Sequence, residues 1–272
     1  MAGTGTLIAD DGLALALHRW TTPDSVAALF YIHGIQSHAG WLYETGPELT
    51  ARGIDVYALD RRGSGRSPGE RGHLPSAEQV LDDYTRAVDA VADEVGDRPL
   101  VALGQSLGGS VLAALWCSRA LPVRKLILCA PALGQQRSRH DPAALAERRD
   151  RSGSAPQEVG LANHAYTDLP EYLAFLAADP LMLRRITAAT QATLVHLEDR
   201  YVHGSPHGEI PVEVAMPAED PIIDLSAARA QLRRLAPAAE ERVFDTGVHY
   251  LEFSRARTAY WDWLADRVRE GR

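Results

Sequence analysis

A short segment in the middle of the chain carries the residues best suited to nucleophilic chemistry. Residues 104–108 read Gly-Gln-Ser-Leu-Gly, with Ser106 at the centre of a G-x-S-x-G pattern. Apolar residues before it predict a strand over 99–103, and Ala- and Leu-rich residues after it predict a helix over 107–120. A strand, a tight turn and a helix are the setting in which this pattern marks a nucleophile elbow. The two glycines leave room for a strained serine with an exposed hydroxyl, so Ser106 is the predicted nucleophile.

A serine nucleophile needs a base, and in this architecture the chain order is serine, acid, histidine. His249 fits that order, because it follows a predicted last strand at 242–244 and precedes a predicted terminal helix at 255–269. Five other histidines fall in or near an irregular middle segment and are interpreted as solvated or hydrogen-bonded surface groups, with contact of one of them with substrate as the alternative: His140, His164, His196, His203 and His207. His249 is therefore the predicted base.

Three carboxylates compete for the role of the acid that orients His249. Asp220 comes just after a predicted strand at 210–216 and is followed by proline, which places it at the carboxyl edge of the sheet. Glu219 is the second choice. Asp224 begins the next predicted helix and is expected to cap it, because aspartate accepts hydrogen bonds from the free N–H groups there.

Two backbone N–H groups must stabilise the oxyanion of the tetrahedral intermediate. The N–H of Leu107, directly after the nucleophile, is one candidate. The second should come from the loop after a buried strand at 26–32, where Ile35 is the expected donor. For His33, in the same loop, hydrogen bonds that order the loop are favoured over a catalytic role.

Buried strands and amphipathic helices alternate along most of the chain, which predicts a mainly parallel sheet covered on both faces. The predicted strands are 13–20, 26–32, 54–59, 99–103, 125–130, 210–216 and 242–244, and the predicted helices 40–52, 76–95, 107–120, 225–235 and 255–269. The alternation fails between 134 and 209, where helical pieces are expected at 169–178 and 181–197. We predict an α/β core over 1–133 and 210–272, with 134–209 inserted as a cap.

Composition limits the partners that the chain can have. Its 272 residues are 46% hydrophobic and 24% charged, and the formal net charge of -8 argues against nucleic acid and anionic membrane surfaces. Residues 1–10 lack the features of a signal peptide, and no apolar run is long enough for membrane insertion. Cys117 and Cys129 are interpreted as small core residues, so a cytoplasmic location is expected. The sequence makes no prediction of the oligomeric state.

With these pieces in place, the chain resembles the α/β-hydrolase superfamily, and within it the monoacylglycerol lipase and serine aminopeptidase-like group. The matching residues are His33, Gly34, His38, 60–67, Gly72, His73, 104–109, Asp220 and His249. The resemblance implies a mostly parallel eight-stranded sheet flanked by helices, a helical cap and no cofactor. It also implies a catalytic triad of Ser106, Asp220 and His249, with the oxyanion hole at Ile35 and Leu107. Its candidates for substrate contact are His33, Gly34, Gln105 and His38.

Two departures from the pattern of this group bear on the substrate. Position 105 is glutamine, where the lipase-like members usually carry histidine. A lid that docks on a membrane would be apolar, whereas the predicted cap is rich in arginine. The arginines are Arg137, Arg139, Arg148, Arg149 and Arg151. A soluble substrate is thus at least as well supported as a monoacylglycerol.

The predicted function is hydrolysis of an ester-type bond, in a carboxylester, lactone or thioester, through an acyl-enzyme on Ser106. The substrate would be a small acyl compound, either soluble or lipid-like. An acyltransferase or a cyclase could use the same residues, and a protein that binds a ligand without turnover is a further alternative. Neither a metal site at His203 and His207 nor a nucleotide site at 60–67 is predicted, since their spacings do not match the known motifs.

Overall fold

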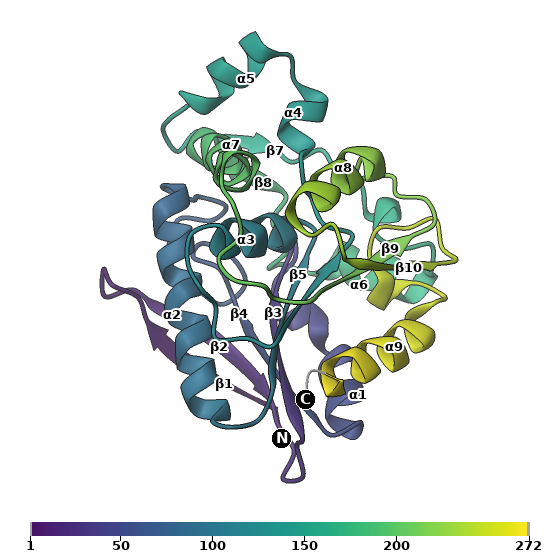
Figure 1. Cartoon of the computed structure of the whole chain (residues 1–272). Coiled ribbons are helices and arrows are strands. Elements are labelled where there is room, and N and C mark those ends of the chain that lie inside the picture. Colours follow the sequence, from purple (N-terminus) through teal and green to yellow (C-terminus); the bar gives the residue numbers. More distant parts are fainter. Residues whose placement is uncertain (1, 271–272) are drawn as a thin grey trace.

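An eight-stranded sheet runs through the computed structural model, which describes residues 2–270 (Figure 1). The strand order is β1-β2-β4-β3-β5-β6-β9-β10. Within this sheet, as described for residues 2–270, the pairs β1–β2 and β2–β4 are antiparallel and the other pairs are parallel. The strands span Ala2–Ile8 (β1), Ala14–Trp20 (β2), Ala27–Ile32 (β3), Ile54–Leu59 (β4), Leu100–Gln105 (β5), Lys125–Cys129 (β6), Val212–Pro217 (β9) and Glu240–Phe244 (β10). The prediction of a mostly parallel eight-stranded sheet is confirmed. Met1, Gly271 and Arg272, which the predicted core includes, lie outside the described residues.

Helices cover both faces of the sheet and explain why the central strands are continuous apolar runs. Side chains of β3 alternate between two hydrophobic clusters, with Phe30 on one face and Leu29 on the other. The cluster around Phe30 takes side chains from α2 (Ala77–Val95), α3 (Leu107–Trp116) and α8 (Leu225–Leu235), and the cluster around Leu29 takes them from α1 (Thr45–Ala51) and α9 (Arg257–Arg269). With both faces covered, β3, β4, β5 and β6 are buried at every position.

Several element boundaries differ from the sequence prediction. The N-terminal strand β1 was not predicted, because it is an exposed edge strand that contains two glycines and lacks an apolar pattern. The helix predicted at 40–52 is divided into a 3-10 turn, Ala39–Leu42, and α1. The helix predicted at 107–120 ends at Trp116.

Residues 134–209, which we call the insertion, add no strand to the main sheet within the described chain. Most of them, including α4, α5 and α7, lie near the top of Figure 1, while α6 lies lower, beside β9 and β10 in this view. The helix predicted at 181–197 was wrong in its first half, because Thr187 caps a helix that begins only at residue 188. The elements are α4 (Gln135–Arg139), α5 (Pro142–Arg149), β7 (Pro156–Glu158), a 3-10 turn (Asn163–Ala165), α6 (Pro170–Ala178), β8 (Arg185–Thr187) and α7 (Ala188–His203).

The insertion packs firmly on the rest of the molecule. Helix α7 contacts α3 and α2. Its Leu197 and Tyr201 are fully buried in the same hydrophobic cluster as Phe30 of the sheet. The Tyr201 hydroxyl accepts a hydrogen bond from the Gly134 N–H at 3.2 Å, where the insertion begins. None of the helices described is long and apolar enough to cross a membrane.

Candidate active site

Ser106 occupies a strained turn between β5 and α3. Its backbone angles are φ 54 and ψ -120, and Ala130 is the only other non-glycine residue described with a positive φ. A Cβ added at Gly104 would overlap the backbone of Gly108. A Cβ added at Gly108 would overlap the backbone of Ile32. The glycines of the pattern are therefore required by close backbone approach, and they allow the serine its unusual conformation.

His249 and Asp220 form a buried pair at the same edge of the sheet. His249 Nδ1 lies 2.7 Å from Asp220 Oδ2, and both side chains are almost completely inaccessible to solvent. The other oxygen of Asp220 accepts the N–H groups of Ile222 and Ile223 at 2.8 and 2.9 Å. These bonds fix the carboxylate, which in turn orients the imidazole with its proton on Nδ1.

The two competing carboxylates point elsewhere. Asp224 accepts the N–H groups of Ser226 and Ala227, each at 3.0 Å, and so caps α8 as the sequence predicted. Glu219 is exposed and makes no side-chain hydrogen bond with the described residues. Only Asp220 among the three contacts His249.

The second nitrogen of His249 faces Gln105 in this structure. His249 Nε2 lies 3.3 Å from Gln105 Nε2. Since His249 Nδ1 donates to Asp220, its Nε2 carries a lone pair that accepts the glutamine amide. The described chain contains no direct hydrogen bond between Ser106 Oγ and His249 Nε2.

Both predicted oxyanion-hole amides are available. The N–H groups of Ile35 and Leu107 have no hydrogen-bond acceptor among residues 2–270. The loop that carries Ile35 is held by the buried Arg61, whose Nη2 donates to the carbonyls of Gly34 and Ile35 at 3.1 and 3.2 Å. Arg61 thus fixes the carbonyls of Gly34 and Ile35, while the N–H of Ile35 has no acceptor in the described chain.

The four candidates for substrate contact line none of the pocket beside Ser106. The His33 Nδ1–H donates to the Gly34 carbonyl at 2.9 Å, and its Nε2 accepts the Arg61 N–H at 3.1 Å, so His33 orders the loop. His38 Nε2 lies 3.0 Å from Asp179 Oδ2, and its Nδ1 accepts the Gly40 N–H, so a contact of His38 with substrate stays a prediction. Gly34 allows close packing, since a Cβ there would lie 2.7 Å from Gln105 Oε1.

Comparison with known proteins identifies the family of this chain. Residues 23–255 match the protein family described as "Serine aminopeptidase, S33". The chain belongs to this family. The predicted family is thus confirmed, and membership makes the chain a hydrolase of the lipase and esterase class.

Relatives of this S33-family chain include lipases. A monoacylglycerol lipase of Mycolicibacterium smegmatis is 27% identical over 232 residues, which cover 83% of this chain and 81% of that protein. The mouse monoglyceride lipase is 28% identical over 126 residues, which cover 46% of this chain and 42% of that protein.

Two solved structures show the same fold. The monoacylglycerol lipase from Paleococcus ferrophilus has a TM-score of 0.80 at 20% identity, over 95% of this chain and 99% of that one. A soluble variant of the Saccharomyces cerevisiae monoglyceride lipase, in complex with a substrate analog, has a TM-score of 0.83 at 15% identity. The match covers 99% of this chain and 94% of that one.

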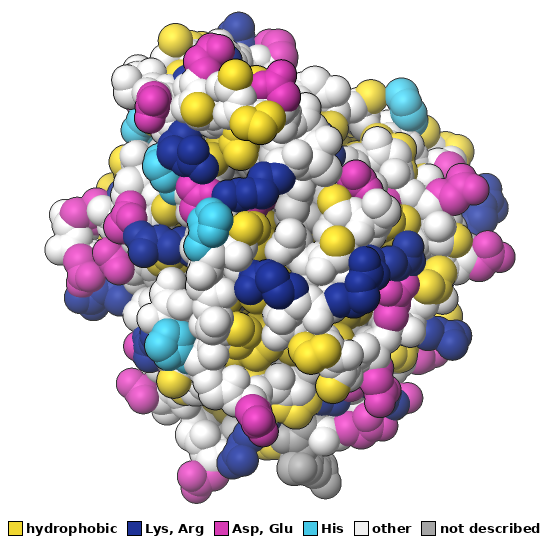
Figure 2. Space-filling view, turned by 45° about the horizontal axis from the view of Figure 1, so that its top comes forward, with side chains coloured by type: hydrophobic (Ala, Val, Ile, Leu, Met, Phe, Trp, Pro, Cys, Tyr) yellow, Lys and Arg dark blue, Asp and Glu magenta, His cyan; other side chains and the backbone are white. Residues whose placement is uncertain are grey.

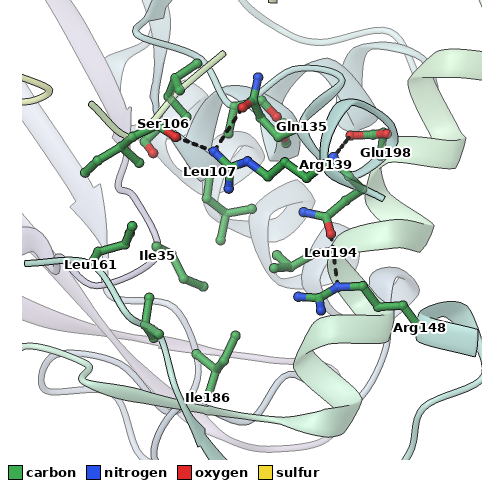
Figure 3. Close-up of a pocket in the computed structure, with 16 residues that line it drawn as sticks. Ile35, Ser106, Leu107, Gln135, Arg139, Arg148, Leu161, Ile186, Leu194 and Glu198 are labelled. Carbon is green, nitrogen blue, oxygen red and sulfur yellow. Dashed lines mark hydrogen bonds between the residues drawn. The ribbon is translucent and has the colours of Figure 1, made fainter. Parts of the chain in front are cut away.

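A pocket of about 140 Å³ opens beside Ser106 in this S33-family chain (Figure 3). The core contributes Ile35, Ser106 and Leu107 to its wall, while the insertion contributes both apolar and charged side chains. Those from the insertion are Gln135, Gln136, Arg139, Arg148, Val159, Leu161, Ile186, Leu194 and Glu198. The pocket is therefore apolar over most of its surface and carries two guanidinium groups.

Sequence reasoning missed how the insertion is bound to the site. The Ala165 carbonyl accepts the His249 N–H at 2.9 Å. The Tyr166 ring packs edge-on against the imidazole of His249, with 5.9 Å between the ring centroids. The Tyr166 hydroxyl donates to Gln36 Oε1 at 2.7 Å, one residue after the predicted oxyanion donor Ile35. Single aromatic and amide residues in irregular segments carry no periodic signal, so these contacts could not be predicted.

Proposed function

We propose that this S33-family hydrolase cleaves carboxylic ester bonds, with Ser106 as nucleophile, His249 as general base and Asp220 as the acid that orients it. The observation that carries the proposal is the convergence of three elements at one sheet edge. The strained Ser106 lies beside a pocket, the His249–Asp220 bond is 2.7 Å long, and the amides of Ile35 and Leu107 are free. This combination is what acyl transfer to water requires.

In the proposed mechanism, the Ser106 hydroxyl first takes the place of the Gln105 amide at His249 Nε2. Ser106 Oγ then attacks the carbonyl carbon of the ester and its proton passes to His249, while the N–H groups of Ile35 and Leu107 stabilise the oxyanion. Collapse breaks the bond to the alcohol, which leaves with the proton from His249. Water attacks the acyl-enzyme, gives a proton to His249, and releases the acid with Ser106 restored.

We also propose that the insertion acts as the cap of this site and selects the substrate. The wall of the pocket combines side chains of the core with side chains of α4, α5, β8 and α7. Figure 2, which brings the top of Figure 1 forward, shows hydrophobic side chains interrupted by basic and acidic ones across this face. A cap that inserts into a membrane would present a continuous apolar surface. The mixed surface seen here instead suits a small acyl substrate that arrives from solution.

The test is turnover of p-nitrophenyl butyrate by the wild type and two serine variants. Ser106→Ala is expected to lower kcat by about 10⁴-fold with unchanged thermal stability, because the nucleophile is lost and the fold is not. Ser110→Ala is the matched control, since Ser110 also lines the pocket but donates to the Ala132 carbonyl at 2.6 Å. Wild-type turnover that survives Ser106→Ala would refute the assignment.

A further inference from the structure

Two arginines of the insertion reach into the pocket that holds Ser106. Arg139 lies at the end of α4 and Arg148 in α5. Figure 3 shows both guanidinium groups directed into the pocket, that of Arg139 toward Ser106 and that of Arg148 beside Leu194. Neither arginine forms an ion pair with any carboxylate of the described chain. A positive charge at a catalytic pocket without a negative partner is unusual, because charged side chains taken from water are normally paired.

Nearby carboxylates are already occupied by other groups. Glu198, which also lines the pocket, accepts the N–H of Gln136 and the guanidinium of Arg137. Asp199 pairs with Arg137 and Arg149, Glu147 pairs with Arg151, and Asp224 caps α8. After these pairs are formed, neither Arg139 nor Arg148 lies within ion-pair distance of a carboxylate in residues 2–270, although the charge of Arg139 helps to lower the pKa of the exposed Asp224.

The donors of the two arginines are also largely unused. Arg148 donates only from Nε, to Gln136 Oε1 at 3.1 Å, so both of its terminal nitrogens are free within the described chain. Arg139 donates only from Nη2, to Gln135 Oε1 and to the Ile222 carbonyl. A guanidinium with free terminal N–H groups is suited to a carboxylate or phosphate, which accepts two parallel hydrogen bonds.

Electrostatics point in the same direction. Burial lowers the pKa of Arg148, and the neighbouring charges of Arg151 and Arg139 lower it further. Burial likewise lowers the pKa of His140, and the same three arginines add to that effect. The positive charges therefore lie close enough to repel one another, and an anion bound among them would relieve the repulsion.

We infer that the substrate of this enzyme is an ester that also carries an anionic group, a carboxylate or a phosphate, which Arg148 and Arg139 bind while Ser106 attacks the ester. Apolar side chains line the same pocket, including Ile35, Leu161 and Leu194, and they suit a short hydrocarbon chain that links the ester to the anionic group. The inference rests on the proposed ester hydrolysis and adds the substrate class.

Two matched pairs of esters test it, one for each side of the ester bond. The acyl-side pair is p-nitrophenyl hydrogen adipate and its methyl ester, p-nitrophenyl methyl adipate. The alcohol-side pair is 1-hexanoylglycerol 3-phosphate and 1-hexanoylglycerol. We expect kcat/KM to be at least about 10-fold higher for the anionic member of one pair, since a charge-assisted bidentate contact is stronger than a neutral one. Which pair responds identifies the carboxylate or the phosphate as the anionic group.

Neighbouring arginines of α5 provide a matched control. Arg148→Gln should lower kcat/KM for the anionic ester by at least about 10-fold more than for its neutral partner, so that the preference for the anionic member is lost. Arg149→Gln removes the same charge one residue further on, but Arg149 pairs with Asp199 and lines no part of the pocket, so the preference should persist. Equal losses in the two variants, or no anionic preference in either pair, would overturn the inference while leaving ester hydrolysis intact.

A binding measurement separates this inference from the proposed function. If the wild type cleaves none of the four esters, the proposed function fails. Calorimetry with monomethyl adipate and dimethyl adipate on the Ser106→Ala variant then still shows whether the pocket binds an anionic group. Binding of the monomethyl ester that is lost on adding Arg148→Gln supports an anion site. Equal binding of the two esters, or no binding of either, overturns it.

Discussion

The amide nitrogen of Gln105 lies 3.3 Å from His249 Nε2, so the residue before the proposed nucleophile is hydrogen-bonded to the proposed base. The other amide atom, Gln105 Oε1, is buried without a partner in the described chain. Gln105 therefore competes with Ser106 for the lone pair that must take the serine proton. Closure of the Ser106–His249 hydrogen bond requires this contact to give way.

Replacing Gln105 tests that competition. Gln105→Leu keeps much of the side-chain volume and removes the amide, so it should free His249 Nε2. We expect kcat/KM with p-nitrophenyl butyrate to rise by about 5-fold, the equivalent of one neutral hydrogen bond of about 1 kcal/mol. A decrease of 10-fold or more would mean that Gln105 holds His249 in its working orientation.

The choice of Asp220 as the acid is tested by a pair of identical substitutions. Asp220→Asn should lower kcat by about 10⁴-fold, because the amide favours the wrong imidazole tautomer. Asp224→Asn should leave kcat within about twofold, since asparagine also caps helices well. Steady-state kinetics of both variants at one pH measure the two effects on kcat. A larger loss in Asp224→Asn than in Asp220→Asn would assign the role of the acid to Asp224.

A buried carboxyl group behind the site should make folding stability depend on pH. Glu252 lies fully buried in the turn Leu251–Phe253, where one oxygen accepts the Tyr31 hydroxyl at 2.7 Å and the other has no partner in the described chain. Burial raises the pKa of Glu252 from 4.5 to about 7. The folded protein thus holds a proton that the unfolded chain releases near pH 4.5, so stability falls as the pH rises from 4.5 to 7.

Glu252→Gln should remove this contribution. Relative to the variant, the wild type should lose on the order of 3 kcal/mol of unfolding free energy between pH 4.5 and 7.5. Urea unfolding at several pH values measures the difference. Glu209→Gln is the control, because Glu209 is exposed; a wild type and a Glu252→Gln variant with parallel pH profiles would contradict the account.

Arg61 offers a test of the oxyanion loop. Arg61→Met removes the donors that hold the Gly34 and Ile35 carbonyls, so kcat should fall by about 10²-fold with KM little changed. Arg62→Met is the matched control: Arg62 pairs with Asp83 and Asp11, so its loss should lower the melting temperature but spare kcat. Equal kcat in the two variants would exclude a role of Arg61 in positioning the loop.

The sequence predicted those parts of the molecule that have strong local or periodic signals. The buried strands and amphipathic helices follow from apolar patterns, and the turn at Ser106 follows from its two glycines. The His249–Asp220 contact was predicted because chain order and strand ends bring late loops to one sheet edge.

Other parts depend on contacts between distant, irregular segments and could not be predicted. The strand Ala2–Ile8 exists because β2 offers it an edge, although its own residues are small and exposed. The contact between His38 and Asp179, 141 residues later in the chain, had no signal in the sequence. The arginines of the insertion were noticed as a departure from a membrane lid, while their place in the pocket required the fold.

The most direct test of the central claim is the intact mass of the protein after incubation with a fluorophosphonate, which reacts covalently with activated serines. One adduct is expected on the wild type and on Ser110→Ala, and none on Ser106→Ala or His249→Ala. An adduct that persists on Ser106→Ala, or a folded wild type that forms none, would contradict the assignment of Ser106 as a nucleophile activated by His249.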